Sequence, residues 1–194
     1  MKIILASNSP RRRELLEQMG IKDFKVAAPN VDESVEDSLS PAESVEQLSL
    51  RKARAAAQKV GPSDLISAAD TVVVLDGTVL GKPHDQAEAF AMLSALSGRE
   101  HHVYTGVTVL RGEDAVTQHE ETAVAFREIL PDEIRGYIAT GEPMDKAGAY
   151  GIQGMGALLV SGIRGDYCNV VGLPVFRLGR ILKEFGVDLL GNRE

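Results

Sequence analysis

The chain has 194 residues, of which 44% are hydrophobic and 25% charged, a composition typical of one globular domain with a sizeable core. Its formal net charge of −7 disfavours a general nucleic-acid binder, because the phosphate backbone would be repelled. No apolar run approaches the roughly 20 residues of a transmembrane helix, and the single Cys168 excludes an internal disulfide and a Cys-rich zinc site. We therefore expect one domain, residues 1–194, in the cytoplasm, with no nucleic-acid or membrane partner.

The order of the predicted elements begins with strand, helix, strand, helix and ends with strands in succession. Helices are expected to start at Ser9-Pro10 and Ser40-Pro41, where an N-cap residue precedes proline. The dipeptide Asp76-Gly77 predicts a tight hairpin. Strands are predicted at residues 2–6, 24–28, 65–75, 78–81, 103–110 and 115–126, and helices at 10–20, 41–60, 85–96, 131–140 and 173–185. This order favours an α/β fold with a mixed twisted sheet and flanking helices.

Three arginines, Arg11, Arg12 and Arg13, occupy the first turn of the first predicted helix. The helix dipole makes that end electropositive, so cations are unfavourable there unless an anion binds. Free N–H groups, guanidinium groups and the hydroxyl of Ser7 or Ser9 could hold a phosphate. The alternative is that the arginines only reach solvent, for which Arg13 is best placed.

An acid, Asp70, interrupts the apolar strand at residues 68–74. A buried, unpaired carboxylate costs several kcal/mol, roughly, so a cation or hydrogen-bond donors should compensate it. Extending the hairpin register places Lys82 opposite Thr71 and Pro83 opposite Asp70, although an ideal pleat would put Asp70 and Lys82 on opposite faces. Alternatively, Asp70 is a structural acid at a strand end.

Glu33 and Asp32 lie in a polar loop and offer hard oxygen ligands, which suit Mg²⁺ or Mn²⁺ accompanying a triphosphate. Loop acids are commonly just solvated, so this pattern alone does not decide. Lys52 lies in a helix near Arg51 and Arg54, a composition that also fits a solvated basic face.

The segment 142–154 combines glycines with Asp, Lys, Tyr and Gln, which is typical of a loop that approaches a ligand closely. Gln153 carries a donor and an acceptor, as the recognition of a base edge requires. The sequence has no P-loop or Rossmann fingerprint. The histidines lack metalloprotease spacing and are interpreted as edge or surface residues: His84, His101, His102 and His119.

Five blocks together carry a resemblance to a known family: Ser7 to Leu16, Ala69 to Val73, Gly81 to Pro83, Glu142 to Gly154, and Val170 to Pro174. In this order and spacing the chain resembles the Maf family of nucleotide pyrophosphatases from residue 3 to about residue 180. The resemblance implies a fold related to the inosine-triphosphate pyrophosphatases, with a cleft between two lobes, and a homodimer. It also implies metal-dependent release of pyrophosphate and a house-cleaning role.

Arg11, Thr71 and Gln153 match the branch of the family that acts on dTTP and UTP, and that branch is expected to include modified pyrimidine nucleotides among its substrates. A sister branch, which acts on 7-methyl-GTP, has glutamate in the Gln153 segment. Two alternatives stay open: a non-catalytic nucleotide sensor of septum formation, and a pyrophosphatase for non-canonical purines such as dITP.

The resemblance assigns the expected roles. The catalytic residues are Asp70, Lys52, Lys82 and Glu33; the substrate-binding residues are Ser7, Arg11, Arg12, Thr71 and Gln153; the ligands of Mg²⁺ or Mn²⁺ are Glu33 and Asp70. We expect the cations to neutralise the triphosphate while Asp70 orients or deprotonates the attacking water.

Overall fold

The computed structural model describes residues 2–36 and 38–191, so residues 1, 37 and 192–194 of the predicted domain lie outside the described part. The chain forms two compact units. The first unit consists of the residues up to Asp70, residues 105–120 and the residues from Gly172 onward; the second consists of residues 71–104 and 121–171. Whether both units act as a single domain stays a prediction.

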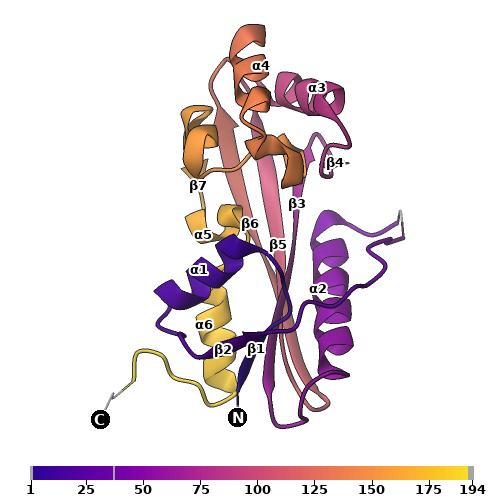
Figure 1. The fold of residues 1–194 in the computed structure, drawn as a ribbon, viewed down its shortest axis with the longest axis vertical. Helices are drawn as coiled ribbons and strands as arrows, with labels where there is room; N and C mark the ends of the chain where they lie inside the picture. The colour runs from indigo at the N-terminus through magenta and orange to yellow at the C-terminus, as the bar shows by residue number, and fades with distance from the viewer. Residues whose placement is uncertain (1, 37, 192–194) are drawn as a thin grey trace. The chain divides into compact units, whose positions relative to one another are not determined.

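The described residues form a seven-stranded sheet with strand order β2-β1-β3-β5-β6-β7, and β4 pairs with β3 (Figure 1). The strands are β1 (Ile3–Leu5), β2 (Phe24–Val26), β3 (Leu65–Leu75), β4 (Thr78–Leu80), β5 (Glu100–Arg111), β6 (Asp114–Phe126) and β7 (Val160–Arg164). β1 runs parallel to β2 and β3, whereas β3–β4 and β6–β7 are antiparallel. The predicted mixed sheet is therefore confirmed.

Helices α1 to α4 begin where proline or capping residues predict, and two further helices follow. They are α1 (Pro10–Gln18), α2 (Pro41–Ala57), α3 (Gln86–Leu96), α4 (Pro131–Ala139), α5 (Tyr167–Val171) and α6 (Val175–Glu184). Ser40 and Glu43 form a reciprocal capping box at α2, and the Asp85 side chain accepts the Glu88 N–H at α3. Proline at the first helical position opens α1, α2 and α4 because its fixed φ suits the helix and its missing N–H costs nothing there.

The core of the first unit places α2 against the sheet. Ala53 and Ala56 of α2 pack in one buried cluster with Ile4 of β1 and Ala68 of β3. A Cβ on Gly106 of β5 would lie 2.2 Å from the Val45 carbonyl oxygen, so only glycine permits this approach of β5 to α2. These small residues bring α2 close to the strands. As a result Lys52, the residue before Ala53, reaches β3.

The second unit has its own core, in which α3 and α4 pack on each other and on the strands. Its aromatic centre joins Phe126 of β6 and Tyr150 of the glycine-rich segment, with ring centroids 4.7 Å apart. His101 of β5 is fully buried against both rings. The interpretation of His101 as an edge or surface residue was therefore wrong. Its Nε2 lies 2.7 Å from the Tyr150 hydroxyl, and a neutral imidazole with such a partner can be buried where a charged imidazolium could not.

Three further features depart from the predicted elements. β7 and α5 were not predicted, because the glycines around them give neither strand nor helix periodicity. The 142–158 segment contains three short 3₁₀-helices, η1 (Glu142–Asp145), η2 (Ala147–Ala149) and η3 (Gly154–Leu158). The β3–β4 pairing has the predicted register, with Leu75 opposite Thr78, but it ends at Leu80 and does not extend to Lys82.

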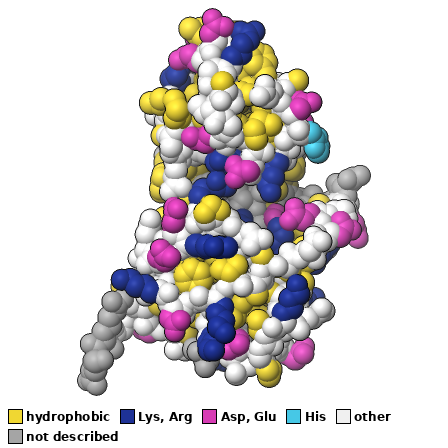
Figure 2. All heavy atoms as spheres, in the orientation of Figure 1, with side chains coloured by type: hydrophobic (Ala, Val, Ile, Leu, Met, Phe, Trp, Pro, Cys, Tyr) yellow, Lys and Arg dark blue, Asp and Glu magenta, His cyan; other side chains and the backbone are white. Residues whose placement is uncertain are grey.

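None of the described helices is long and apolar enough to cross a membrane. On the face shown in Figure 2, basic and acidic side chains are interspersed with apolar ones. That face carries charges of both signs rather than one continuous field.

Candidate active site

The start of α1 is organised by Ser7 rather than by its N-cap residue. The Ser7 hydroxyl, which is almost completely buried, accepts the Ser9 N–H at 3.2 Å and an Arg12 guanidinium N–H at 3.3 Å. Ser9 is the N-cap residue, but among the described residues its side chain makes no cap hydrogen bond. The start of α1 is the positive end of the helix dipole, and it carries arginine side chains, so its electrostatics favour an anion.

Arg12 is fixed in place from two sides. Its Nε donates to the Gly172 carbonyl oxygen at 2.8 Å, in addition to the bond to Ser7. Burial lowers the pKa of the Arg12 guanidinium, the Asp70 carboxylate raises it, and the neighbouring Arg11 lowers it further. Arg12 thus faces a carboxylate and a second guanidinium at once. An incoming polyphosphate would relieve the repulsion between the two arginines.

Lys52 joins the predicted acids. Its ammonium group donates to Asp70 Oδ1 at 2.6 Å and lies 2.7 Å from Glu33 Oε1. The side chains of Lys52 and Asp70 are 13% and 12% exposed, whereas that of Glu33 is 60% exposed. The solvated-face interpretation of Lys52 was therefore wrong, because α2 packs closely enough on β3 for Lys52 to compensate the buried acid.

The loop that carries Glu33 is held by Arg51, the residue before Lys52. The Arg51 guanidinium donates to the carbonyl oxygens of Asp32 and Ser34, at 2.5 and 2.8 Å. These two carbonyl groups flank Glu33, so consecutive side chains of α2 bind the backbone and the acid of one loop. Sequence reasoning missed this role of Arg51, since nothing local to α2 specifies a contact with residues 32–34.

The Asp32 carboxylate is engaged within its own loop. It accepts the N–H and the hydroxyl of Ser34 at 2.9 and 2.8 Å, an Asx-turn geometry. Of the two loop acids, Glu33 rather than Asp32 reaches Lys52.

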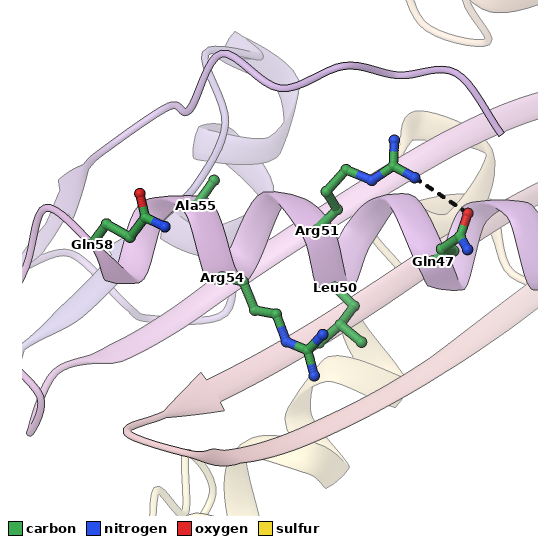
Figure 3. Close-up of a pocket in the computed structure, with 6 residues that line it drawn as sticks. All are labelled: Gln47, Leu50, Arg51, Arg54, Ala55 and Gln58. Carbon is green, nitrogen blue, oxygen red and sulfur yellow. Dashed lines mark hydrogen bonds between the residues drawn. The ribbon is translucent and has the colours of Figure 1, made fainter.

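A pocket on the outer face of α2 contains none of the predicted site residues. Figure 3 shows the helix with Arg51 and Arg54 extending on opposite sides of it, and with Gln47 bonded to Arg51. The lining residues lie on α2 or, for Gln58, at its C-cap: Gln47, Leu50, Arg51, Arg54, Ala55 and Gln58. Because one helix and its C-cap residue supply every wall, this pocket has no converging catalytic groups and is not the candidate site.

The Glu33 and Asp70 carboxylates have the chemistry that a divalent ion requires. Both bind the same Lys52 ammonium, so they converge on one point. Among the described residues, no three His, Cys, Asp or Glu side chains cluster as a complete metal site. Mg²⁺ is commonly held by one or two carboxylates together with substrate phosphates and water, and this donor set fits that pattern.

Three predicted residues, Thr71, Lys82 and Gln153, belong to the second unit. Thr71 is half-buried on β3, Lys82 is exposed after β4, and Gln153 is half-buried before η3. The glycine-rich segment contacts residues that are close in sequence to Thr71 and Lys82: the Gly148 N–H donates to the carbonyl oxygen of Gly81 at 3.0 Å, and a Cβ on Gly148 would lie 3.0 Å from Val73 Cγ1. The second unit therefore brings the Gln153 segment next to the neighbours of Thr71 and Lys82.

The predicted site residues thus fall into two groups. The structure brings together Ser7, Arg11, Arg12, Glu33, Lys52 and Asp70 in the first unit. The hairpin argument for placing Lys82 near Asp70 is not supported by strand pairing, because β4 ends before it. The roles assigned to Thr71, Lys82 and Gln153 stay predictions.

The sequence is similar to one protein family over nearly its whole length. A family profile described as Maf-like protein matches residues 2–185. A protein of Moorella thermoacetica named dTTP/UTP pyrophosphatase is 57% identical over 194 residues, covering 98% of each chain. One of the same name from Symbiobacterium thermophilum is 56% identical over 188 residues, covering 97% of this chain and 96% of its own.

A solved structure, a nucleoside-triphosphatase / dITP/XTP pyrophosphatase from Mycobacterium abscessus, is 17% identical and covers 95% of this chain and 98% of its own, with a TM-score of 0.47. The profile match and the two relatives cover nearly the entire chain, and together they show its family. The chain belongs to the family of Maf-like proteins.

Proposed function

We propose that the protein is a nucleoside triphosphate pyrophosphatase that hydrolyses dTTP and UTP, and modified pyrimidine nucleotides, to the nucleoside monophosphate and pyrophosphate. The observation that carries the proposal is the compensated acid in the first unit: Asp70, 8% exposed, held by Lys52 at 2.6 Å and near Arg12. The two relatives named dTTP/UTP pyrophosphatase support the choice of substrate.

The cations bind and neutralise the polyphosphate. Arg11, Arg12 and Ser7 lie at the start of α1, where N–H groups and guanidinium groups favour a phosphate chain. Lys82 is proposed to place a further positive charge near the pyrophosphate leaving group. These cations balance the negative charge of pyrophosphate as it leaves. Catalysis is therefore mainly positioning and electrostatic stabilisation.

Asp70 orients the attacking water and accepts its proton as the water attacks the α-phosphorus. The Lys52 ammonium keeps one carboxylate oxygen of Asp70 in a fixed direction. Glu33 and Asp70 would hold Mg²⁺ or Mn²⁺, which when bound supplies charge stabilisation at the phosphoryl oxygens.

Recognition of the base is proposed for Gln153 and Thr71. The Gln153 carboxamide has a donor and an acceptor, which matches the alternating edge of a thymine or uracil ring. A site built to hydrogen-bond one base edge rejects a mismatched edge because buried polar groups are left unpaired.

The direct test measures pyrophosphate release from dTTP, UTP, dGTP and dITP side by side, with Mn²⁺ or Mg²⁺. The proposal predicts release from dTTP and UTP well above that from dGTP. Preference for dITP would favour the non-canonical purine activity, and tight dTTP binding without release would favour the nucleotide sensor; either result would overturn the proposal.

The remaining expectations from the family are also proposals: a homodimer, a cytoplasmic location and no nucleic-acid partner. Analytical ultracentrifugation of the full chain tests the dimer, because a monomer at micromolar concentration would contradict it.

A further inference from the structure

The segment 151–156, which carries Gln153, is hydrogen-bonded to a pair of side chains that have no role in the proposed function. The pair is Tyr137 of α4 and Glu142 of η1, joined by a hydrogen bond from the tyrosine hydroxyl to Glu142 Oε1 at 2.9 Å. Tyr137 is 4% exposed. The pair lies within the second unit, as does the whole segment.

Peptide N–H groups on both sides of Gln153 converge on this pair. Before it, the Gly151 N–H donates to the Tyr137 hydroxyl at 3.1 Å. After it, the Met155 N–H donates to Glu142 Oε2 at 3.1 Å and the Gly156 N–H to Glu142 Oε1 at 3.0 Å. One tyrosine–glutamate pair therefore ties together the two ends of a six-residue loop.

The glycines of the loop permit this closure. A Cβ on Gly156 would lie 2.0 Å from the Gly151 carbonyl oxygen and 2.6 Å from the Tyr137 hydroxyl. A Cβ on Gly154, which has φ +66°, would lie 2.7 Å from Glu142 Oε2. The two ends of the loop are thus in backbone contact, and Gln153 is left in an extended conformation (φ −89°, ψ 165°) between them.

The electrostatics of the pair are consistent with an ionised acceptor. Burial acts to raise the pKa of the Glu142 carboxyl, but the N–H groups of Gly156 and Met155 and the Tyr137 hydroxyl outweigh it and lower that pKa. Burial raises the pKa of the Tyr137 hydroxyl, which therefore stays protonated and donates. A charged acceptor makes each of these hydrogen bonds stronger than one between neutral groups.

We propose that Glu142, with Tyr137, is a positioning residue that determines base selectivity by fixing the Gln153 loop. This inference rests on the proposed function, in which Gln153 recognises the pyrimidine. A carboxamide that reads a base edge must be held in place by its backbone, because a displacement of about 1 Å is enough to lose a hydrogen bond's geometry.

The sharpest variant is Glu142→Gln, which has the same shape. Both oxygens of Glu142 accept N–H donors, so the amide NH₂ of glutamine faces a donor in either orientation. The matched control is Glu133→Gln on α4, whose carboxylate accepts the Leu130 N–H at 2.8 Å and pairs with Arg127. That carboxylate stabilises the same unit and, within residues 2–36 and 38–191, makes no hydrogen bond to the loop.

The measurement is the ratio of kcat/KM for dTTP to that for dGTP, because a smaller folded fraction lowers both values and leaves their ratio unchanged. We expect Glu142→Gln to lower the ratio about tenfold, mainly through a higher KM for dTTP, and Glu133→Gln to leave it unchanged. Gln153→Ala should lower it similarly, and adding Glu142→Gln to Gln153→Ala should lower it no further, because the two act as one unit.

A second readout does not depend on activity. Hydrogen–deuterium exchange of the segment 151–156, in the protein without nucleotide, should increase in Glu142→Gln and not in Glu133→Gln. Unchanged exchange in Glu142→Gln would overturn the inference, and so would a wild-type selectivity ratio.

The outcomes separate the inference from the proposed function. If the wild type shows no preference for dTTP, both are wrong. If the wild type and Gln153→Ala behave as proposed while Glu142→Gln matches Glu133→Gln, the positioning role alone is wrong.

Discussion

Asp70 is the residue whose environment is most specific to its proposed task. It interrupts an apolar strand, is 8% exposed, and shares Lys52 with Glu33. The strand accommodates this acid only because a cation from another element meets it.

Replacing Asp70 with Asn should remove the proton acceptor without unfolding the protein. The side chain keeps its shape, and Lys52 keeps Glu33 as a partner. We expect kcat with dTTP to fall by about 10²- to 10⁴-fold. Pyrophosphate release measures this loss and circular dichroism checks the fold; a folded variant with full turnover would rule out the proton-accepting role.

His101 should make stability depend on pH. Burial, followed by the neighbouring His102, lowers its pKa from 6.5 to about 4. Between these values the unfolded state binds more protons than the folded state. Stability from this group is therefore full above about pH 6.5 and falls as the pH decreases toward 4, by about 3 kcal/mol in total.

Denaturant unfolding of the wild type and of His101→Gln across pH 7 to 4 isolates this effect. The glutamine is neutral throughout, so the unfolding free energies of the two proteins should converge as the pH falls. A gap between them that does not change with pH would contradict the predicted titration.

At the scale of elements, α2 presents two consecutive side chains to one loop, Arg51 to its backbone and Lys52 to Glu33. Arg51→Lys keeps the charge but loses the fork that binds two carbonyl groups. We expect kcat with dTTP to fall about 10- to 100-fold and the required metal concentration to rise, because Glu33 is no longer held in place.

Arg54→Lys is the matched control for that prediction. Arg54 lines the same pocket of α2 and, in the part of the chain that the structure describes, makes no hydrogen bond to the Glu33 loop. Both variants are assayed with dTTP over a titration of Mn²⁺. Equal behaviour of Arg51→Lys and Arg54→Lys would show that the grip on residues 32–34 has no catalytic consequence.

The elements that the sequence predicted well are those with strong local signals. α1 and α2 were found from serine–proline starts, and the β3–β4 hairpin from Asp76-Gly77. β7 and α5 follow glycines and are short, so their conformation depends on packing rather than on periodicity. Local patterns therefore predicted most of the sheet and missed its β7 edge.

At the scale of the whole molecule, residue types were easier to predict than contacts. The arginines of α1 and the acid of β3 were recognisable as conflicts with their local surroundings, and the structure resolves the second through Lys52. That pairing joins residues 18 positions apart through helix-to-sheet packing. Neither Arg51 nor Glu142 conflicts with its local sequence, so only the folded structure reveals their contacts.

Without nucleotide, the stability of the whole chain should hardly depend on bound metal. Lys52 binds both Glu33 and Asp70, so the metal-free protein already compensates its two proposed ligands. Chelation with EDTA should therefore abolish pyrophosphate release while changing the melting temperature of the nucleotide-free protein by only about 1 °C.

Nucleotide should reverse this insensitivity to chelation. With a non-hydrolysable dTTP analogue at about 100 times its Kd, binding adds about 2.7 kcal/mol, or about 5 to 10 °C for a chain of this size. Since the triphosphate supplies the remaining oxygen ligands, EDTA should cancel most of that increase. A large loss of stability on chelation without nucleotide would instead mean that the ion is part of the fold, and turnover in EDTA would remove the ion from the reaction.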